Sequence, residues 1–291
     1  IYSRVNNPNM EILEERLAIL NNSEKSLVFS SGMGAISNTC LSFLKPGDSL
    51  LYSEPVYGGS DFLFTNTLPA FGIKTYPFSH GLTLEELTNT IKKCPNLKMI
   101  FLETPCNPIL DLISIKDIYN LKNTINKDIL ILVDNTMIGP LYSEPLKFGA
   151  DLVVYSITKF IGGHSDLVAG GVSGRESLIS LIRVYRTIFG TILDPDTCWL
   201  IKRSLATLKL RMDQQCQNTK EIISFLKSAP QITKIYYPGE NSDNQKKILN
   251  EEYKDSGSIL SFTIEGGEKR CFQILNKFKV FKLAVSLGSV E

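Results

Sequence analysis

A lysine and an aspartate stand at the ends of two apolar segments, where parallel sheets gather their catalytic groups. Lys159 is the only lysine or arginine between Lys147 and Arg175, and Asp134 directly follows the apolar run 129–133. A lysine shielded from water loses its proton easily and becomes an amine nucleophile for carbonyl groups. Each residue alone is more often a solvated loop lysine or a turn aspartate. Together they suggest carbonyl chemistry by an amine beside a carboxylate.

A Schiff-base lysine, with an aspartate beside a pyridinium nitrogen, is the combination that pyridoxal phosphate (PLP) requires of its protein. The carboxylate keeps the ring nitrogen protonated, so that the ring can accept electrons when a substrate loses its α proton. The cofactor's phosphate also needs a binding site. Gly32, Met33 and Gly34 open a helical stretch, where backbone N–H groups and the helix dipole can bind an anion. Ser156 and Thr158 could add hydroxyl donors.

The glycines of this segment permit a second interpretation. Residues 32–37 follow a strand and form a partial dinucleotide-binding fingerprint, with Glu54 as a ribose ligand. The third glycine of the fingerprint is replaced by Ser37, and the pattern gives Lys159 and Asp134 no role. A nucleotide-binding oxidoreductase and a non-catalytic folded remnant are therefore the alternatives to a PLP enzyme.

Length and composition restrict the class of protein. The chain has 291 residues, which suggests about two domains, and its formal net charge of +1 argues against nucleic acid as a partner. No apolar run is long enough to span a bilayer. The six cysteines are scattered without the spacing of metal ligands, so we expect no metal site. Scattered cysteines of this kind usually serve as small, buried apolar side chains. They are typical of proteins in a reducing compartment, which favours the cytoplasm.

Short apolar segments alternate with helical patterns over the first two thirds of the chain. The pair Asn7-Pro8 predicts the start of a helix that extends through Leu20, and Thr83 and Glu86 form a capping box for another helix. Five segments are expected to be strands: 27–29, 50–52, 98–102, 129–133 and 152–155. The alternation predicts an α/β fold with a mainly parallel sheet covered by helices on both faces.

The pattern changes near Thr197. From there a helix is predicted to run without a break toward Leu226, because no proline or glycine interrupts it. It is followed by predicted strands at 232–237, 259–264 and 281–285 and by a helix through Phe272 and Leu275. We expect a remnant of an N-terminal arm (1–9), a large cofactor-binding domain (10–205) and an incomplete, smaller α/β domain (206–291).

Residues 151–165, DLVVYSITKFIGGHS, resemble at every defined position the lysine-site signature of the Cys/Met-metabolism family of PLP enzymes. The likeness extends over essentially the whole chain, at residues 2–4, 31–34, 55–59, 103–105, 107–108, 133–136 and 286–288. The family includes cystathionine γ-synthase, cystathionine γ- and β-lyases, methionine γ-lyase and homoserine-ester sulfhydrylases. The resemblance implies the aminotransferase-like architecture of fold type I, and homotetramers built as dimers of dimers with shared active sites.

The resemblance also implies roles for individual residues. Lys159 would form the Schiff base and carry the proton, Asp134 would pair with the pyridine nitrogen, and Tyr57 would stack on the ring and assist the leaving sulfur. The other implied cofactor ligands are Gly32, Met33, Ser156 and Thr158 at the phosphate, Asn107 at the phenolic oxygen, and Tyr2 and Arg4 from a neighbouring subunit. Ser286 would contact the amino-acid substrate. His80 and His164 are candidate bases, but the family signature uses the position of His164 without making it the central base, so His164 is interpreted as structural.

The sequence specifies the type of reaction less clearly than it specifies the cofactor. We expect a carbon–sulfur γ-lyase acting on methionine or cystathionine, with γ-replacement on an activated homoserine as the alternative. Val285 resembles methionine γ-lyases, whereas Gly59 stands where well-known methionine γ-lyases have a cysteine. The family's substrate-carboxylate arginine lies well beyond residues 286–288. The sequence stops at Glu291 before reaching it, so we interpret the chain as truncated at both ends.

Overall fold

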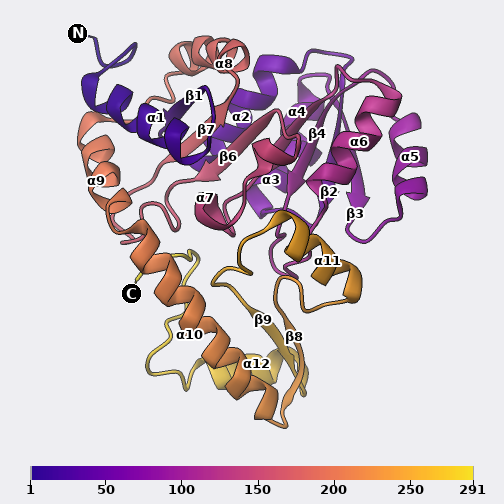
Figure 1. The fold of residues 1–291 in the computed structure, drawn as a ribbon, viewed down its shortest axis with the longest axis vertical. Helices are drawn as coiled ribbons and strands as arrows, with labels where there is room; N and C mark the ends of the chain where they lie inside the picture. The colour runs from indigo at the N-terminus through magenta and orange to yellow at the C-terminus, as the bar shows by residue number, and fades with distance from the viewer. Residues whose placement is uncertain (1, 291) are drawn as a thin grey trace.

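A seven-stranded, mainly parallel sheet forms the centre of the protein (Figure 1). The computed structural model describes residues 2–290. The strand order is β1-β7-β6-β5-β4-β2-β3, and only β7 runs antiparallel to both of its neighbours. The strands are β1 (Lys25–Phe29), β2 (Ser49–Glu54), β3 (Lys74–Ser79), β4 (Leu97–Glu103), β5 (Leu130–Asp134), β6 (Leu152–Ser156) and β7 (Gly170–Gly174). The predicted α/β class is confirmed.

Helices bury both faces of this sheet. On β6, Val153 packs in one apolar cluster, with residues of α1 and α9, whereas Leu152 and Val154 pack in another, with residues of α2 and α8. Successive strand residues point to opposite faces, so both faces are core. The helices of this part are α1 (Pro8–Leu20), α2 (Gly32–Phe43), α3 (Gly58–Phe62), α4 (Leu68–Ala70), α5 (Leu84–Lys92), α6 (Ile115–Ile125), α7 (Gly139–Tyr142), α8 (Glu176–Phe189) and α9 (Pro195–Leu205).

The C-terminal third extends away from the large sheet along one long helix, α10 (Leu208–Ser228) (Figure 1). A two-stranded antiparallel sheet of β8 (Ile232–Tyr236) and β9 (Ser261–Ile264) lies beside it with α12 (Gly267–Leu275). In contrast, α11 (Asp243–Glu252) returns to the large sheet: Ile248 belongs to the same apolar cluster as α1. The domain boundary at 205/206 stays a prediction.

The sequence signals for helix starts are confirmed where side chains cap the backbone. The side chain of Asn7 accepts the backbone N–H of Asn9 at the start of α1, and Pro8 occupies the first turn. At α5, Thr83 and Glu86 form the reciprocal capping box. These caps satisfy N–H groups that a helix leaves without internal partners, which is why the patterns are reliable.

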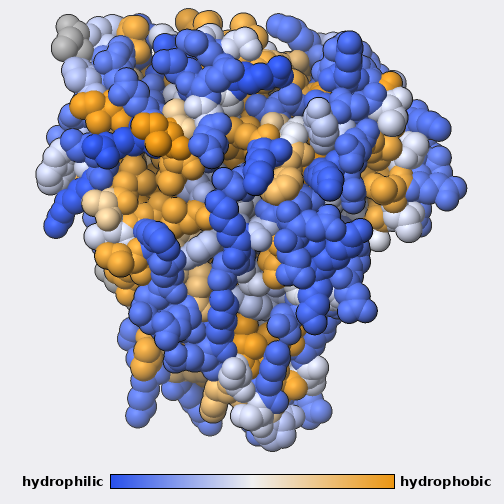
Figure 2. All heavy atoms as spheres, viewed as in Figure 1, coloured by the Kyte–Doolittle hydropathy of each residue, from blue (hydrophilic) through white to orange (hydrophobic). Residues whose placement is uncertain are grey.

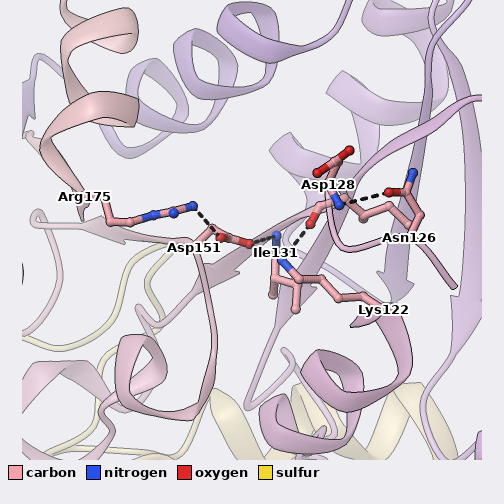
Figure 3. Close-up of polar contacts among 7 residues, drawn as sticks. Lys122, Asn126, Asp128, Ile131, Asp151 and Arg175 are labelled. Carbon is pink, nitrogen blue, oxygen red and sulfur yellow. Dashed lines mark hydrogen bonds and ion pairs between the residues drawn. The ribbon is translucent and has the colours of Figure 1, made fainter. Parts of the chain in front are cut away.

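The carboxylate of Asp151 links the starting ends of β5 and β6 (Figure 3), opposite the ends that carry Asp134 and Ser156. Its Oδ2 accepts from Lys122 Nζ at 2.7 Å and from the backbone N–H of Ile131 at 2.9 Å, and its Oδ1 binds Arg175. Lys122 also donates to the carbonyl of Ile129. The buried ammonium therefore has partners that fix the register at this end of the sheet.

We expect replacement of Lys122 by methionine to lower the free energy of unfolding by about 3 kcal/mol, because it removes one partner of a buried ion pair and leaves a carboxylate behind. Arg175 is the matched control: it binds the same carboxylate, but its side chain is 59% exposed. Arg175→Met should cost less than about 1 kcal/mol. Urea unfolding of the two variants compares them, and equal losses would contradict this assignment.

Two predictions about the C-terminal third are wrong. The helix expected to run from 197 to 226 breaks at Ala206-Thr207 into α9 and α10. The carbonyl of Ser204 accepts from the N–H of Thr207, a local turn bond, and from the guanidinium of Arg211, so a turn and a side chain satisfy this carbonyl where the helix breaks. The strand expected at 281–285 does not form: Phe281, for example, is exposed, and no strand of residues 2–290 pairs with this segment.

Other features of the structure complete the comparison with the sequence patterns. The edge strand β3 and the glycine-containing β7 were not predicted, because neither has a long apolar run. Five cysteines are buried as expected, but Cys271 is exposed. Within residues 2–290 no helix is both long and apolar enough to cross a membrane, and no group of three or more His, Cys, Asp or Glu side chains could hold a metal ion.

Candidate active site

The ends of four strands place the predicted site residues at one edge of the sheet. Glu103 at the end of β4 lies directly opposite Asp134 at the end of β5. Ser156 ends β6 opposite Gly170, which also pairs with the last residue of β1. A side chain on Gly170 would come within 2.1 Å of the Ser31 carbonyl, so only a glycine allows the start of α2 to approach β7 this closely. These strand ends and the residues that directly follow them form one edge of the sheet, here called the rim.

Lys159 lies in the turn after β6, half-buried, with its ammonium directed to the C-terminal segment. Its Nζ donates a hydrogen bond to Ser286 Oγ at 2.8 Å, and burial lowers the pKa of the lysine. Gly288 packs on the backbone of the same turn at φ +87°, where an added Cβ would lie 2.9 Å from the Phe160 nitrogen. The contact between Lys159 and Ser286 joins two segments that the sequence analysis associated only by resemblance.

Arg211 of α10 secures the turn that carries the lysine. Its guanidinium donates to the carbonyls of Phe160 and Ile161, at 2.8 and 3.3 Å. Gly163 makes room for it, because an added Cβ would lie 2.0 Å from the Arg211 Nη1 atom. The sequence analysis missed Arg211. Its only signal is a cation in a helix 52 residues after Lys159, and such a spacing carries no information about contact.

Asp134 is a buried carboxylate, 7% exposed. Its Oδ1 accepts two hydrogen bonds from Thr136, one from the backbone N–H at 3.0 Å and one from the hydroxyl at 2.6 Å. The Thr136 hydroxyl in turn accepts from the N–H of Ser156 at 2.8 Å. Burial raises the pKa of Asp134 to about 6. Thr136, whose role was not predicted, thus aligns the carboxylate with the end of β6.

The N-terminus of α2 faces the end of β6. The side chain of Ser31 caps the helix through Gly34, and the first amides, those of Gly32 and Met33, have no partner within the helix. A Cβ on Gly32 would lie 2.9 Å from the Cβ of Ser156, so the two elements are at closest approach here. Thr158 lies nearby, but its hydroxyl donates to the Ala169 carbonyl. Its predicted phosphate contact would require that this bond be exchanged.

Tyr57 and Asn107 lie in two loops at this edge. Tyr57 precedes α3 and is 51% exposed, and Asn107 is half-buried with no hydrogen bond from its side chain to residues 2–290. An added Cβ on Gly59 would lie 2.7 Å from a ring carbon of Tyr57 and 3.1 Å from the Met33 sulfur. Any larger residue at position 59 would therefore displace the Tyr57 ring.

Four of the other residues considered lie outside this constellation. Arg4 donates to the Tyr2 hydroxyl at 3.1 Å and to the Thr187 carbonyl at 3.1 Å, so within one chain the pair lies on the surface beside α8. His164 Nδ1 is 2.7 Å from the Gly162 carbonyl, which agrees with a structural role. His80 has no hydrogen bond to its ring nitrogens, and burial lowers its pKa to about 4.

Comparison with known proteins identifies the family to which this site belongs. The model of the Cys/Met-metabolism family of PLP-dependent enzymes matches residues 1–291. The chain belongs to this family. It is 38% identical to an L-methionine γ-lyase of Fusobacterium nucleatum subsp. polymorphum, over all of this chain and 73% of that one. It is 36% identical to the cystathionine γ-lyase of Bacillus subtilis (strain 168), over all of this chain and 75% of that one.

A solved structure gives the same assignment. The fold of this PLP-dependent enzyme superimposes with a TM-score of 0.93 on cystathionine γ-synthase from Xanthomonas oryzae pv. oryzae, crystallised with aminoacrylate and cysteine. That chain is 31% identical in sequence, and the match covers all of this chain and 74% of the other. The prediction of a PLP enzyme with an aminotransferase-like fold is confirmed, and the oxidoreductase alternative is excluded.

The residues of this PLP-dependent enzyme fit the cofactor. A half-buried amine with a lowered pKa suits the aldehyde, a buried carboxylate with one unused oxygen suits the ring nitrogen, and two free helix amides beside a serine suit the phosphate. Lys159, Asp134, Gly32, Met33 and Ser156 would hold these three parts. The donors lie on separate strand ends, which agrees with the extended shape of the cofactor.

Proposed function

We propose that the enzyme is a carbon–sulfur γ-lyase that eliminates the sulfur substituent of methionine or cystathionine. The observation that carries this proposal is the pairing of Lys159 with Ser286 at the same rim as the buried Asp134. The similarity to lyases acting on both amino acids supports it. Lys159, Asp134 and Tyr57 would be the catalytic residues, and Ser286 would contact the substrate.

The chain's own residues would divide the work as follows. When bound, PLP supplies an electron-withdrawing ring that acidifies the α hydrogen of an amino acid. Lys159 would bind the cofactor and then, as a free amine, take up and return the substrate proton, which its lowered pKa favours. The carboxylate of Asp134 would hold a proton on the ring nitrogen. The Tyr57 hydroxyl, on a half-exposed side chain, would donate a proton to the departing sulfur.

Gamma-replacement on an activated homoserine is the second candidate. Two features favour it: the similarity to a cystathionine γ-synthase structure, and Gly59, which by the resemblance stands where well-known methionine γ-lyases have a cysteine and where a larger residue would meet the Tyr57 ring. In that reaction a thiol would enter where the sulfur or ester had left. The residues that hold the cofactor would be the same in both cases.

The products distinguish the two candidates. Purified enzyme with PLP should convert methionine or cystathionine to an α-keto acid, ammonia and a thiol, measured by keto-acid and ammonia assays. Incubation with O-acyl homoserine and a thiol should yield little thioether. A new thioether formed faster than the keto acid would favour γ-replacement and overturn the lyase proposal. If neither product forms, the chain is the non-catalytic remnant.

We further propose a homo-oligomer, a dimer of dimers in which Tyr2 and Arg4 reach a neighbouring subunit's phosphate site. Apolar surface gathers over α1 and α9 (Figure 2), and Ile12, Ile19 and Trp199 of these helices are among the large apolar side chains that are exposed. Exposed apolar surface of this extent is typical of an interface. The cytoplasm remains the proposed compartment, from the free cysteines.

A further inference from the structure

Glu103 is a buried carboxylate at the site for which the resemblance gave no role. It ends β4, is 3% exposed, and lies opposite Asp134 in the parallel register. Its Oε2 accepts the backbone N–H of Tyr57 at 2.7 Å, and its Oε1 accepts the backbone N–H of Asn107 at 3.0 Å. Its own N–H donates to the Ser53 hydroxyl. One side chain therefore joins two loops that are fifty residues apart in sequence.

The arrangement requires a carboxylate of this length. Two N–H donors point at one side chain from opposite loops, and the two oxygens of a carboxyl group offer an acceptor to each of them. An amide in its place would face one of the N–H groups with its own NH₂. An aspartate keeps the charge but is one methylene shorter, so it cannot span both loops from the end of β4.

We propose that Glu103 is a positioning residue of the active site: by binding both loops, its carboxylate fixes where Tyr57 and Asn107 meet the cofactor. The inference rests on the proposed function, because Tyr57 and Asn107 are its proposed cofactor contacts. It extends that proposal by naming the residue that holds the loops of Tyr57, which is exposed, and Asn107, which is half-buried, in position at the cofactor site.

The position is unfavourable for the fold, which argues that it serves the site. Burial and the nearby Asp134 carboxyl raise the pKa of Glu103 to about 8. The hydrogen-bond partners of the Glu103 carboxyl are two backbone N–H groups, and no salt bridge among residues 2–290 includes it. A buried carboxylate without a cationic partner is costly, and an apolar residue would be cheaper for stability alone.

The test compares Glu103→Gln and Glu103→Asp with the wild-type holoenzyme. For both variants we expect kcat to fall about 10- to 100-fold, since small displacements of positioned groups have effects of this size. We also expect faster hydrogen–deuterium exchange at the Tyr57 and Asn107 amides and a shifted absorption band of the bound cofactor. Full activity in Glu103→Asp would mean that charge alone matters and would overturn the proposal.

Glu252 provides the matched control. It is also a buried carboxylate, it accepts from Ser114 and from the N–H of Ile115, and burial raises its pKa, but it ends α11 and binds the start of α6 rather than the loops of Tyr57 and Asn107. Glu252→Gln should leave the cofactor band and the exchange at Tyr57 unchanged. The same changes in Glu252→Gln as in Glu103→Gln would reduce Glu103 to a structural residue.

Two further outcomes keep the inference separate from the proposed function. If the wild-type enzyme turns over none of the amino acids, the proposed function fails, while amide exchange and the cofactor band still decide the role of Glu103. If neither Glu103 variant folds, amide exchange in the wild-type protein alone tests the proposed role of Glu103. Slow exchange of the Tyr57 and Asn107 amides would support the bridge, and exchange as fast as in open loops would overturn it.

Discussion

Replacement of Lys159 by alanine is expected to abolish turnover, with kcat lowered at least about 10⁴-fold, the upper range for loss of a proton-transferring group. The variant loses both the amine that binds the cofactor and the base that moves the substrate proton. It should still fold, because the lysine contributes one hydrogen bond, to Ser286. Circular dichroism and steady-state kinetics measure the two properties separately.

Lys147 is the matched control for this experiment. It is also a lysine, but its side chain is 68% exposed and 3.8 Å from its nearest carboxylate, Glu144. Lys147→Ala should retain wild-type activity. If Lys159→Ala kept more than a few percent of the wild-type kcat, the assignment of the central amine would be wrong.

Asp134→Asn is expected to have opposite effects on stability and on activity. Asparagine has the same shape and retains an oxygen for the two hydrogen bonds from Thr136. It carries no charge, however, so it cannot keep a proton on the ring nitrogen. We expect kcat/KM to fall about 10²-fold or more, as for other losses of a fixed electrostatic partner.

The stability effect follows from the raised pKa of Asp134. A carboxyl with a pKa of about 6 in the folded, cofactor-free protein and an ordinary value of 3.8 in the unfolded chain binds protons more tightly when folded. Its contribution is fully present below pH 4 and is lost as the pH rises through 6. At pH 8 cofactor-free Asp134→Asn should therefore be more stable than the wild type.

Urea unfolding of the cofactor-free proteins at pH 5 and pH 8 tests this. The gain of Asp134→Asn over the wild type should be larger at pH 8 than at pH 5. Asp166, an exposed aspartate of the loop after β6, is the control, and Asp166→Asn should show no such pH dependence. A destabilised Asp134→Asn at pH 8 would mean that the carboxylate is satisfied in the folded protein.

The sequence predicted those features of the fold that depend on residues close together in the chain. The cap at Asn7 and the capping box of Thr83 and Glu86 depend on neighbours within three residues, and both helices start as predicted. The break between α9 and α10 depends on Arg211 binding the Ser204 carbonyl, a contact that involves a third segment at Ile161. Likewise, an apolar run such as 281–285 becomes a strand only where a partner strand pairs with it.

The residues of the active site also divide into those that the sequence could predict and those that it could not. Residues just after apolar strands, such as Lys159 and Asp134, could be predicted because parallel strands end at one edge. The roles of Thr136, Arg211 and Glu103 could not, because each depends on a hydrogen bond to a different strand or helix. These residues hold the backbone in place. Their type alone is equally typical of the solvated surface.

The most direct measurement of the central claim is borohydride reduction of the purified protein with PLP, followed by peptide mass mapping. A yellow protein with the pyridoxyl group on the peptide that contains Lys159 is the expected result. It would establish the cofactor and the amine that binds it in one experiment. A protein that stays colourless when offered PLP, or an adduct on exposed lysines such as Lys147 alone, would contradict the account.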